Sequence, residues 1–124
     1  MTTAEIAKQL VELCQKGENN KAHDLLYSPN IVSLEAMDMH NMSRESKGID
    51  AVRKKSEWWV TNHTVHSAQA WGPFVAVDKF AVAFDYDVTY KPTGKRNKMK
   101  EIAVYTVANG KIVHEEFLYS MATE

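Results

Sequence analysis

The sequence is poor in the features that mark several classes of protein. Cys14 is the only cysteine among 124 residues, which excludes an internal disulfide and any metal site built from several cysteines. No apolar run approaches the roughly 20 residues needed to cross a membrane, and the first residues lack the basic and apolar regions of a signal peptide. The net charge is -1, and the densest basic cluster spans only 95–100. We therefore expect a cytoplasmic protein that binds neither membrane nor nucleic acid.

Motifs for nucleotide and metal chemistry are absent as well. The chain contains no glycine-rich phosphate loop and no nucleophile elbow, which argues against a nucleotide enzyme. Its five histidines lack the compact spacing of a metal site, since only His63 and His66 stand close together. We expect no metal and no cofactor. The length fits a single domain spanning 1–124.

The first half of the sequence predicts three helices. The first begins with a capping box formed by Thr2 and Glu5, carries one apolar stripe, and ends near Gly17. A second, shorter helix is expected over 20–27, before a proline break. A third is expected from about 48 to 60, where apolar residues again follow helical spacing.

The second half predicts antiparallel strands, because apolar and polar residues alternate between turn signals. The strands are expected at 31–35, 64–70, 74–90 with a break near residue 78, 101–108 and 111–119. A turn is expected at 71–73. The stretch 36–47 has no period and contains three methionines, so we interpret it as a loop that could cover a ligand. Helices followed by antiparallel strands indicate an α+β fold.

Three motifs resemble the SnoaL-like and ketosteroid-isomerase-like proteins of the nuclear transport factor 2-like superfamily. The segment 25–32 is similar to the end of that family's second helix and its first strand. The segment 47–52 is similar to the start of the third helix, and 108–113 to the final hairpin. The resemblance implies a cone-shaped, curved, mostly antiparallel sheet, with three helices from the N-terminal half closing its concave face. It also implies a homodimer, because family members commonly pair.

The resemblance does not carry ketosteroid isomerase chemistry with it. Leu34 stands where that enzyme has its base, and Ala103 stands where it has a protonated aspartic acid. Glu35 lies beside the base position, but strand alternation sends it to the opposite face from Leu34 unless the strand ends first. The family contains isomerases, polyketide cyclases, dehydratases and binding proteins without chemistry, so the fold alone leaves the function open.

Candidate site residues follow from strand alternation together with the concave faces that the resemblance implies. Glu101 and Tyr105 share one face of their strand, and Glu115 and Tyr119 share one face of the next. A carboxyl group in an apolar cavity is a candidate acid or base, and a tyrosine can stabilise an oxyanion. His63 is a further candidate for proton transfer. The expected ligand-binding residues are Phe80, Val82, Phe84, Tyr86, Trp59, Phe117 and Glu35.

Two alternatives remain open for the glutamates. They can face water near the strand ends or pair with lysines. If the alternation is shifted by one residue, Asp85, Asp87 and Glu116 point inward in their place. For His63 an ordinary hydrogen-bonded histidine is the simpler interpretation.

The sequence therefore favours a protein that binds a small apolar molecule with a polar handle. One hypothesis is an isomerase-, cyclase- or dehydratase-type enzyme, a lyase or isomerase, that uses a pocket carboxylate or histidine as acid or base. The alternative is a non-catalytic module that binds a ligand or serves as a dimeric scaffold.

Overall fold

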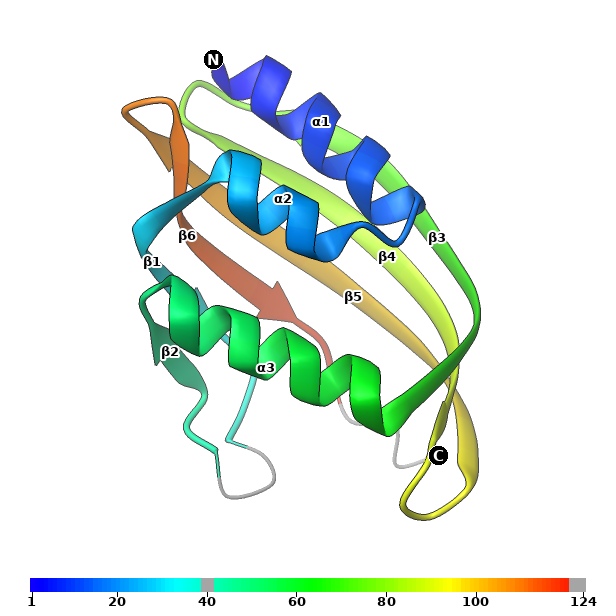
Figure 1. The fold of residues 1–124 in the computed structure, drawn as a ribbon. Coiled ribbons are helices and arrows are strands. Elements are labelled where there is room, and N and C mark those ends of the chain that lie inside the picture. Colours follow the sequence, from blue (N-terminus) through cyan, green and yellow to red (C-terminus); the bar gives the residue numbers. More distant parts are fainter. Residues whose placement is uncertain (39–41, 121–124) are drawn as a thin grey trace.

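The computed structural model describes residues 1–38 and 42–120 and contains three helices on one face of a six-stranded sheet (Figure 1). The helices are α1 (Thr3–Gln15), α2 (Asn19–Leu26) and α3 (Ile49–Asn62). All three lie across the concave side of the bent sheet. Within the described residues, no helix is long and apolar enough to span a membrane.

The sheet has the order β2-β1-β6-β5-β4-β3. Every neighbouring pair is antiparallel except β1 and β6, which are parallel. The last strand therefore lies in the interior of the sheet, between the first strand and the meander. The strands are β1 (Tyr27–Leu34), β2 (Glu45–Lys47), β3 (His63–Val75), β4 (Lys79–Tyr90), β5 (Lys95–Ala108) and β6 (Lys111–Leu118). This is the predicted α+β cone.

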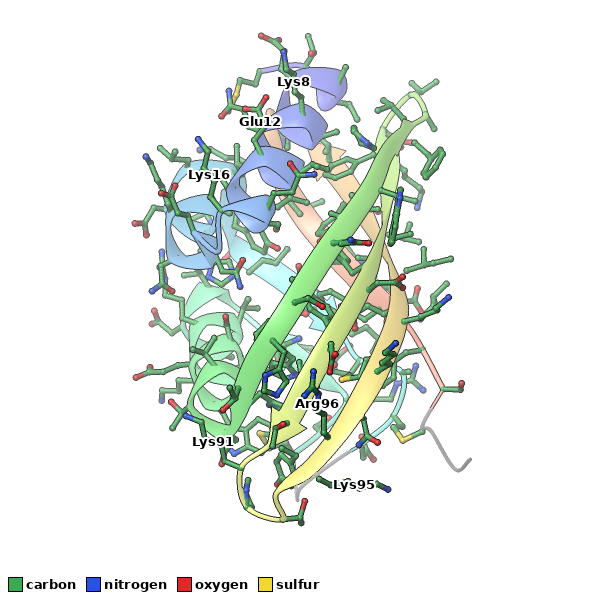
Figure 2. The ribbon with its side chains drawn as sticks, turned by 90° about the vertical axis from the view of Figure 1, so that its right-hand side faces the viewer. Lys8, Glu12, Lys16, Lys91, Lys95 and Arg96 are labelled. Carbon is green, nitrogen blue, oxygen red and sulfur yellow. The ribbon has the colours of Figure 1, made fainter. Side chains whose placement is uncertain are left out.

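The capping box predicted at the start of the chain is confirmed. The Thr2 hydroxyl accepts from the Glu5 backbone N–H at 3.1 Å, and the Glu5 carboxylate accepts from the Thr2 backbone N–H at 3.0 Å. The apolar stripe of α1 is buried against β3 and β4. Figure 2 shows Lys8, Glu12 and Lys16 projecting from the opposite side of this helix, as their four-residue spacing requires.

Four sequence expectations about strands were wrong in detail. β5 begins at Lys95, six residues before the expected start at 101. β1 begins at Tyr27, directly after α2, because its first residue already pairs with Ile112 of β6. The expected loop 36–47 contains β2, which sequence patterns could not show because it has three largely exposed residues. Its residues 39–41 lie outside the described part, so the covering role of this loop stays a prediction.

The expected turn at 71–73 lies inside β3. The pairing with β4 shifts between Trp71 and Phe74, and the strand then continues to Val75. Pro73 lacks an N–H group, but β3 is an edge strand, where a missing donor costs no sheet hydrogen bond on the open side.

Alternate residues of β4 and β5 form the sheet's contribution to the core. Phe80 is 1% exposed, and Val82 and Ala103 are fully buried. They pack beneath the apolar stripes of the helices, including Ile6, Leu10 and Val52. The alternative alternation, with Asp85, Asp87 and Glu116 inward, is therefore wrong for this sheet.

Candidate functional site

Cross-strand register places both predicted glutamates on the concave face. Tyr105 of β5 lies between Phe80 of β4 and Glu115 of β6. Four residues earlier on the same face of β5, Glu101 lies opposite Phe84. The even spacing of strand residues keeps all five side chains on one side of the sheet.

Glu115 is buried and held by two hydroxyl groups. It is 2% exposed. Its Oε1 accepts a hydrogen bond from the Tyr27 hydroxyl at 2.5 Å, and its Oε2 accepts one from the Ser33 hydroxyl at 2.7 Å. Burial raises the pKa of Glu115, while Lys55 and the two hydroxyl donors oppose that rise.

Lys55 of α3 connects this buried carboxylate to the edge of the site. Its Nζ donates to the Ser33 Oγ at 2.5 Å and to the Glu35 Oε2 at 2.8 Å. The same ammonium lies 5.1 Å from the centre of the Phe117 ring. The side chains of Lys55 and Glu35 are 20% and 22% exposed, so the network reaches solvent at this pair.

Glu35 lies inside the site because β1 ends at Leu34, one residue before it. Its Oε1 accepts a hydrogen bond from the Tyr119 hydroxyl at 2.9 Å. Tyr119 itself follows the end of β6. Burial, followed by the nearby Glu35 carboxylate, raises the pKa of Tyr119, so its hydroxyl is protonated near neutral pH.

Glu101 differs from Glu115 in having no hydrogen-bond partner among the described residues. Its pKa is raised to about 7, first by burial and then by the negative charges of Glu35 and Glu115; Lys55 acts in the opposite direction. A carboxyl group with that pKa is half protonated at neutral pH and can both give and take a proton.

Tyrosines and one thiol complete the surroundings of the two carboxyl groups. Burial raises the pKa of Tyr105 and Tyr27 well above the usual range, and it raises that of Cys14 to about 12. These groups are therefore neutral at physiological pH. Cys14 belongs to the core packing, as its place on the apolar stripe of α1 predicted.

The predicted aromatic wall divides into two parts. Phe80 and Val82 are core residues. Phe84 and Tyr86 stack with ring centres 5.9 Å apart, and Trp59 of α3 approaches Tyr86 at 5.6 Å. Phe117 lies under the Lys55 ammonium, as described above. Trp59, Tyr86 and Phe117 are only partly buried, which leaves them surface with which to contact a ligand.

His63 lies apart from the carboxyl network. Its ring stacks on Trp59 at 4.4 Å and also meets the rings of Trp58 and Tyr90. The ring nitrogen Nδ1 is 2.8 Å from the Trp59 carbonyl oxygen. These contacts fit the simpler interpretation, in which His63 joins α3 to the sheet.

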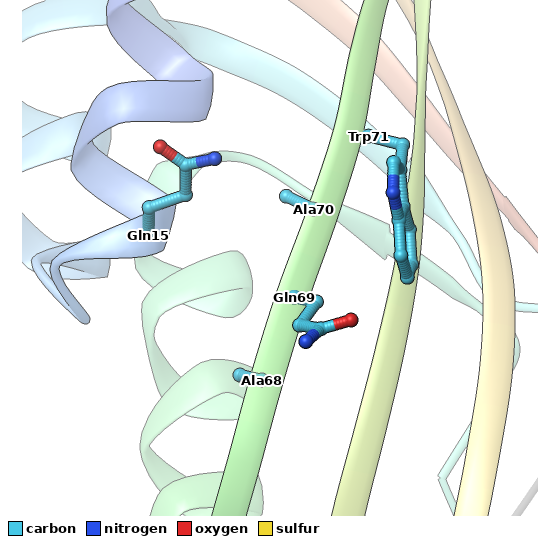
Figure 3. Close-up of a pocket in the computed structure, with 5 residues that line it drawn as sticks. All are labelled: Gln15, Ala68, Gln69, Ala70 and Trp71. Atoms are coloured by element: carbon cyan, nitrogen blue, oxygen red, sulfur yellow. The ribbon is translucent and has the colours of Figure 1, made fainter.

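Two of the hollows on the described surface lie near this face of the sheet or between the helices, and neither is lined by the carboxyl groups. The first, of about 320 Å³, lies between Gln15 at the end of α1 and residues 68–71 of β3 (Figure 3). Ala70 on its rim pairs with Phe84, which pairs with Glu101. Two strand spacings of ~4.8 Å separate the ends of this row, so the hollow lies about 10 Å from Glu101 along the same sheet face. The second, of about 550 Å³, lies between the start of α2 and α3.

Sequence reasoning missed three members of the network, Tyr27, Ser33 and Lys55. Ser33 could have been found from alternation, because Ile31 and Ser33 share the buried face of β1. Lys55 lies three residues after the buried Val52, on the inner side of α3. Nothing in the sequence marks Tyr27, because it was assigned to a helix. The described residues contain no group of three potential metal ligands.

Comparisons with known proteins agree with this geometry. A model of the SnoaL-like domain matches residues 1–119. The chain belongs to the SnoaL-like family. This assignment rests on nearly the whole chain, so the predicted resemblance is confirmed.

Solved structures place this SnoaL-like protein among close and distant relatives. A Mesorhizobium loti protein is 46% identical, with 96% of this chain and 100% of that chain covered and a TM-score of 0.90. Its name proposes a SnoaL-like polyketide cyclase and also carries the words carbohydrate phosphatase. An NTF2-like protein from Burkholderia thailandensis is 21% identical over 97% of this chain and 92% of that chain, with a TM-score of 0.82. At that identity the likeness shows the fold alone. No curated protein matches this chain.

Proposed function

We propose that this SnoaL-like protein binds a small, largely apolar molecule with a polar handle and transfers a proton on it, as an isomerase, cyclase or dehydratase does. Glu101 is the proposed acid or base. The observation that carries the proposal is a carboxyl group with a pKa of about 7 and no hydrogen-bond partner among the described residues. The name of the Mesorhizobium loti relative supports the cyclase class.

The neighbouring residues supply what proton transfer from carbon requires. Abstraction of a proton next to a carbonyl group creates an oxyanion, which neutral hydroxyl donors stabilise in a site with little water. The Tyr119 hydroxyl lies at the open side of the network, bonded to Glu35. Tyr105 lies two residues after Ala103, on the same face of β5 as Glu101. We propose that the hydroxyl groups of both tyrosines donate hydrogen bonds to the polar group of the ligand.

Partly exposed aromatic rings are the proposed contacts for the apolar part of the ligand. Trp59 and Tyr86 pack together at 5.6 Å near the row that joins the first hollow to Glu101. Ligand sites of enzymes are commonly built this way, from apolar walls and a few polar groups. The hollow beside Ala70 is the proposed route of approach.

The function is tested by deuterium exchange at enolisable carbons, which needs no knowledge of the natural substrate. A panel of cyclic ketones and enones is incubated in D₂O with the wild type, and loss of the proton signal is followed by nuclear magnetic resonance. We expect protein-dependent exchange for at least one compound. Glu101→Gln should reduce its rate at least about 100-fold, the usual size of an acid–base contribution.

Glu116→Gln is the matched control. Glu116 lies on β6 beside Glu115 but faces the convex side, opposite Val104. This variant loses one negative charge from the same strand and should exchange protons at the wild-type rate. Equal rates for the wild type and Glu101→Gln would refute the assignment of Glu101.

The alternative function is ligand binding without chemistry. It is favoured by the lining of the two hollows described above, which in neither case includes Glu101 or Glu115. A thermal-shift screen with the same compounds separates the two. Binding without exchange supports the non-catalytic module, and absence of both argues against a small-molecule site on this face.

We also propose that two copies pair through the convex face of the sheet. Trp71, Ile102 and Leu118 are each nearly half exposed and lie in one cross-strand row with Ala83. The adjacent row contains Asp85 opposite Lys100, so a second copy related by a two-fold axis meets charges of both signs.

Sedimentation analysis tests this pairing. Ile102→Lys should convert a dimer to a monomer because it puts a charge at the centre of the apolar row. Val77→Lys is the control, since Val77 is 92% exposed but lies in the turn between β3 and β4, away from that row. A monomeric wild type at micromolar concentration would contradict the proposal.

A further inference from the structure

Tyr27, Ser33 and Lys55 form a hydrogen-bond network around Glu115, and within the described residues none of them is hydrogen-bonded to Glu101. Glu115 is the more deeply buried of the two carboxyl groups, yet both of its oxygens are occupied by hydroxyl donors. Lys55 lies behind one of these hydroxyls and reaches it from a different element, α3. A network built around one carboxylate and not around its neighbour indicates that the two have different tasks.

We infer that Glu115 is a fixed anion of the site and that Lys55, acting through Ser33, is the positioning residue that keeps it ionised and leaves Glu101 to exchange the proton. The inference rests on the proposed function, because it divides the tasks of the two carboxyl groups in that same site. It concerns which group holds the proton before any ligand binds.

The direction of the hydrogen bonds carries the argument. An ammonium group has donors only, so the Ser33 oxygen must accept from Lys55. The single hydroxyl hydrogen of Ser33 is then free to point at the Glu115 Oε2, 2.7 Å away. Tyr27, whose pKa is raised well above its usual range, is protonated and donates to the Oε1. Glu115 thus receives a donor on each oxygen, which is the arrangement that favours a carboxylate over a carboxylic acid.

The positive charge lies close enough to matter. Two hydrogen bonds of 2.5 and 2.7 Å in series place the Lys55 ammonium within about 5 Å of the Glu115 carboxylate. Lys55 shares its charge with Glu35, which it contacts at 2.8 Å. Three carboxyl groups therefore surround one cation. Glu35 is hydrogen-bonded to this cation directly, and Glu115 is linked to it through the Ser33 hydroxyl. Glu101 has neither kind of link among the described residues.

Other titratable groups around the two glutamates do not change this division. They come from α1 and from the strands around the site, and the shifts of their pKa values keep them neutral near pH 7. They are Cys14 of α1, Tyr27 of β1, Tyr86 of β4, Tyr105 of β5 and Tyr119 after β6. Lys55 remains the cation that faces both carboxyl groups.

The test is a titration of side-chain carboxyl ¹³C signals in glutamate-labelled protein, with no ligand added. The Glu101 and Glu115 signals are assigned by their loss in Glu101→Gln and Glu115→Gln. In the wild type we expect Glu101 to take up its proton near pH 7, while Glu115 stays ionised to lower pH. In Lys55→Met the Glu115 midpoint should rise by about two pH units, the size expected when a charge about 5 Å away is lost at an effective dielectric constant of about 20.

Two variants separate this role from a merely structural one. Lys55→Arg keeps the positive charge, so the Glu115 midpoint in this variant should lie close to its wild-type value. Lys54→Met removes a charge from the exposed neighbour on the same helix and should leave that midpoint unchanged.

The inference is overturned if wild-type Glu115 takes up its proton at a higher pH than Glu101. It is also overturned if Lys55→Met moves the Glu115 midpoint no more than Lys54→Met does. Should Lys55→Met fail to fold, the order of the two wild-type titrations still decides. The measurement uses no substrate, so it gives its answer whether or not the deuterium-exchange experiment finds catalysis.

Discussion

Replacing Glu101 by glutamine should stabilise the protein at alkaline pH, and the size of the effect follows from one number. The Glu101 pKa is about 7 in the folded chain, against a usual value of 4.5. A raised carboxyl pKa means that the unfolded chain releases this proton at lower pH than the folded chain. The free energy of unfolding therefore falls as the pH rises from about 4.5 through 7 and levels off above that.

The expected magnitude is large enough to measure. At 1.36 kcal/mol per pKa unit, the shift costs the wild type about 3 kcal/mol at pH 8 and less than about 1 kcal/mol at pH 5. Glutamine cannot ionise, so the Glu101→Gln variant does not lose this free energy of unfolding as the pH rises. Its stability relative to the wild type should increase by about 2 kcal/mol between pH 5 and pH 8.

Urea denaturation followed by circular dichroism at the two pH values provides the measurement. Glu116→Gln, on the convex side of β6, is the control and should show less than about 0.5 kcal/mol of such pH dependence. If the wild type and Glu101→Gln differ in free energy of unfolding by the same amount at pH 5 and pH 8, Glu101 does not have a raised pKa. The proposed acid–base role then loses its basis.

Three further predictions concern the network and the helix beside it. Ser33→Ala should lower the free energy of unfolding at pH 7 by about 1 to 3 kcal/mol, because it removes the hydroxyl between Lys55 and Glu115 and leaves a buried acceptor unsatisfied; urea denaturation measures it, and a neutral effect would contradict the network. Tyr27→Phe should cost a similar amount by the same measurement, and a loss below about 0.5 kcal/mol would show that its bond to Glu115 contributes little. Burial lowers the His23 pKa to about 4 from 6.5, so the folded chain should lose about 2 to 3 kcal/mol as pH falls from 7 to 4, and His23→Leu should lose less over that range; equal pH dependence of the two proteins would refute this.

Regular patterns made the fold predictable. Helical stripes, the alternation along β4 and β5, and the final hairpin at 108–113 all depend on local geometry, which the sequence pattern reflects directly. Alternation, together with the concave faces that the resemblance implies, also predicted that Glu101 and Glu115 share one face of the sheet. Patterns failed where geometry depends on a distant partner, as in the start of β1 at Tyr27, fixed by pairing with β6, and in the short strand β2.

The network around Glu115 was only partly predictable for the same reason. Its donors come from β1 and α3, and they meet β6 over sequence separations of 88 and 82 residues for Tyr27 and Ser33. No local spacing connects such residues. Lys55 was overlooked because a lysine on a helix usually faces water, and here it extends inward to reach Glu35 and Ser33.

The position of β6 between β1 and β5 has a consequence for how the protein folds while the ribosome is synthesising it. The meander β3-β4-β5 and its cover α1 can assemble as soon as residues 1–108 have emerged. During that time β1 has only the three-residue β2 beside it. Its other partner is made last. Completion of the sheet, and with it the contact of Tyr27 and Ser33 with Glu115, must therefore wait until β6 has been synthesised, and a ribosome stalled before residue 111 would carry a chain whose first strand is still unpaired on that side.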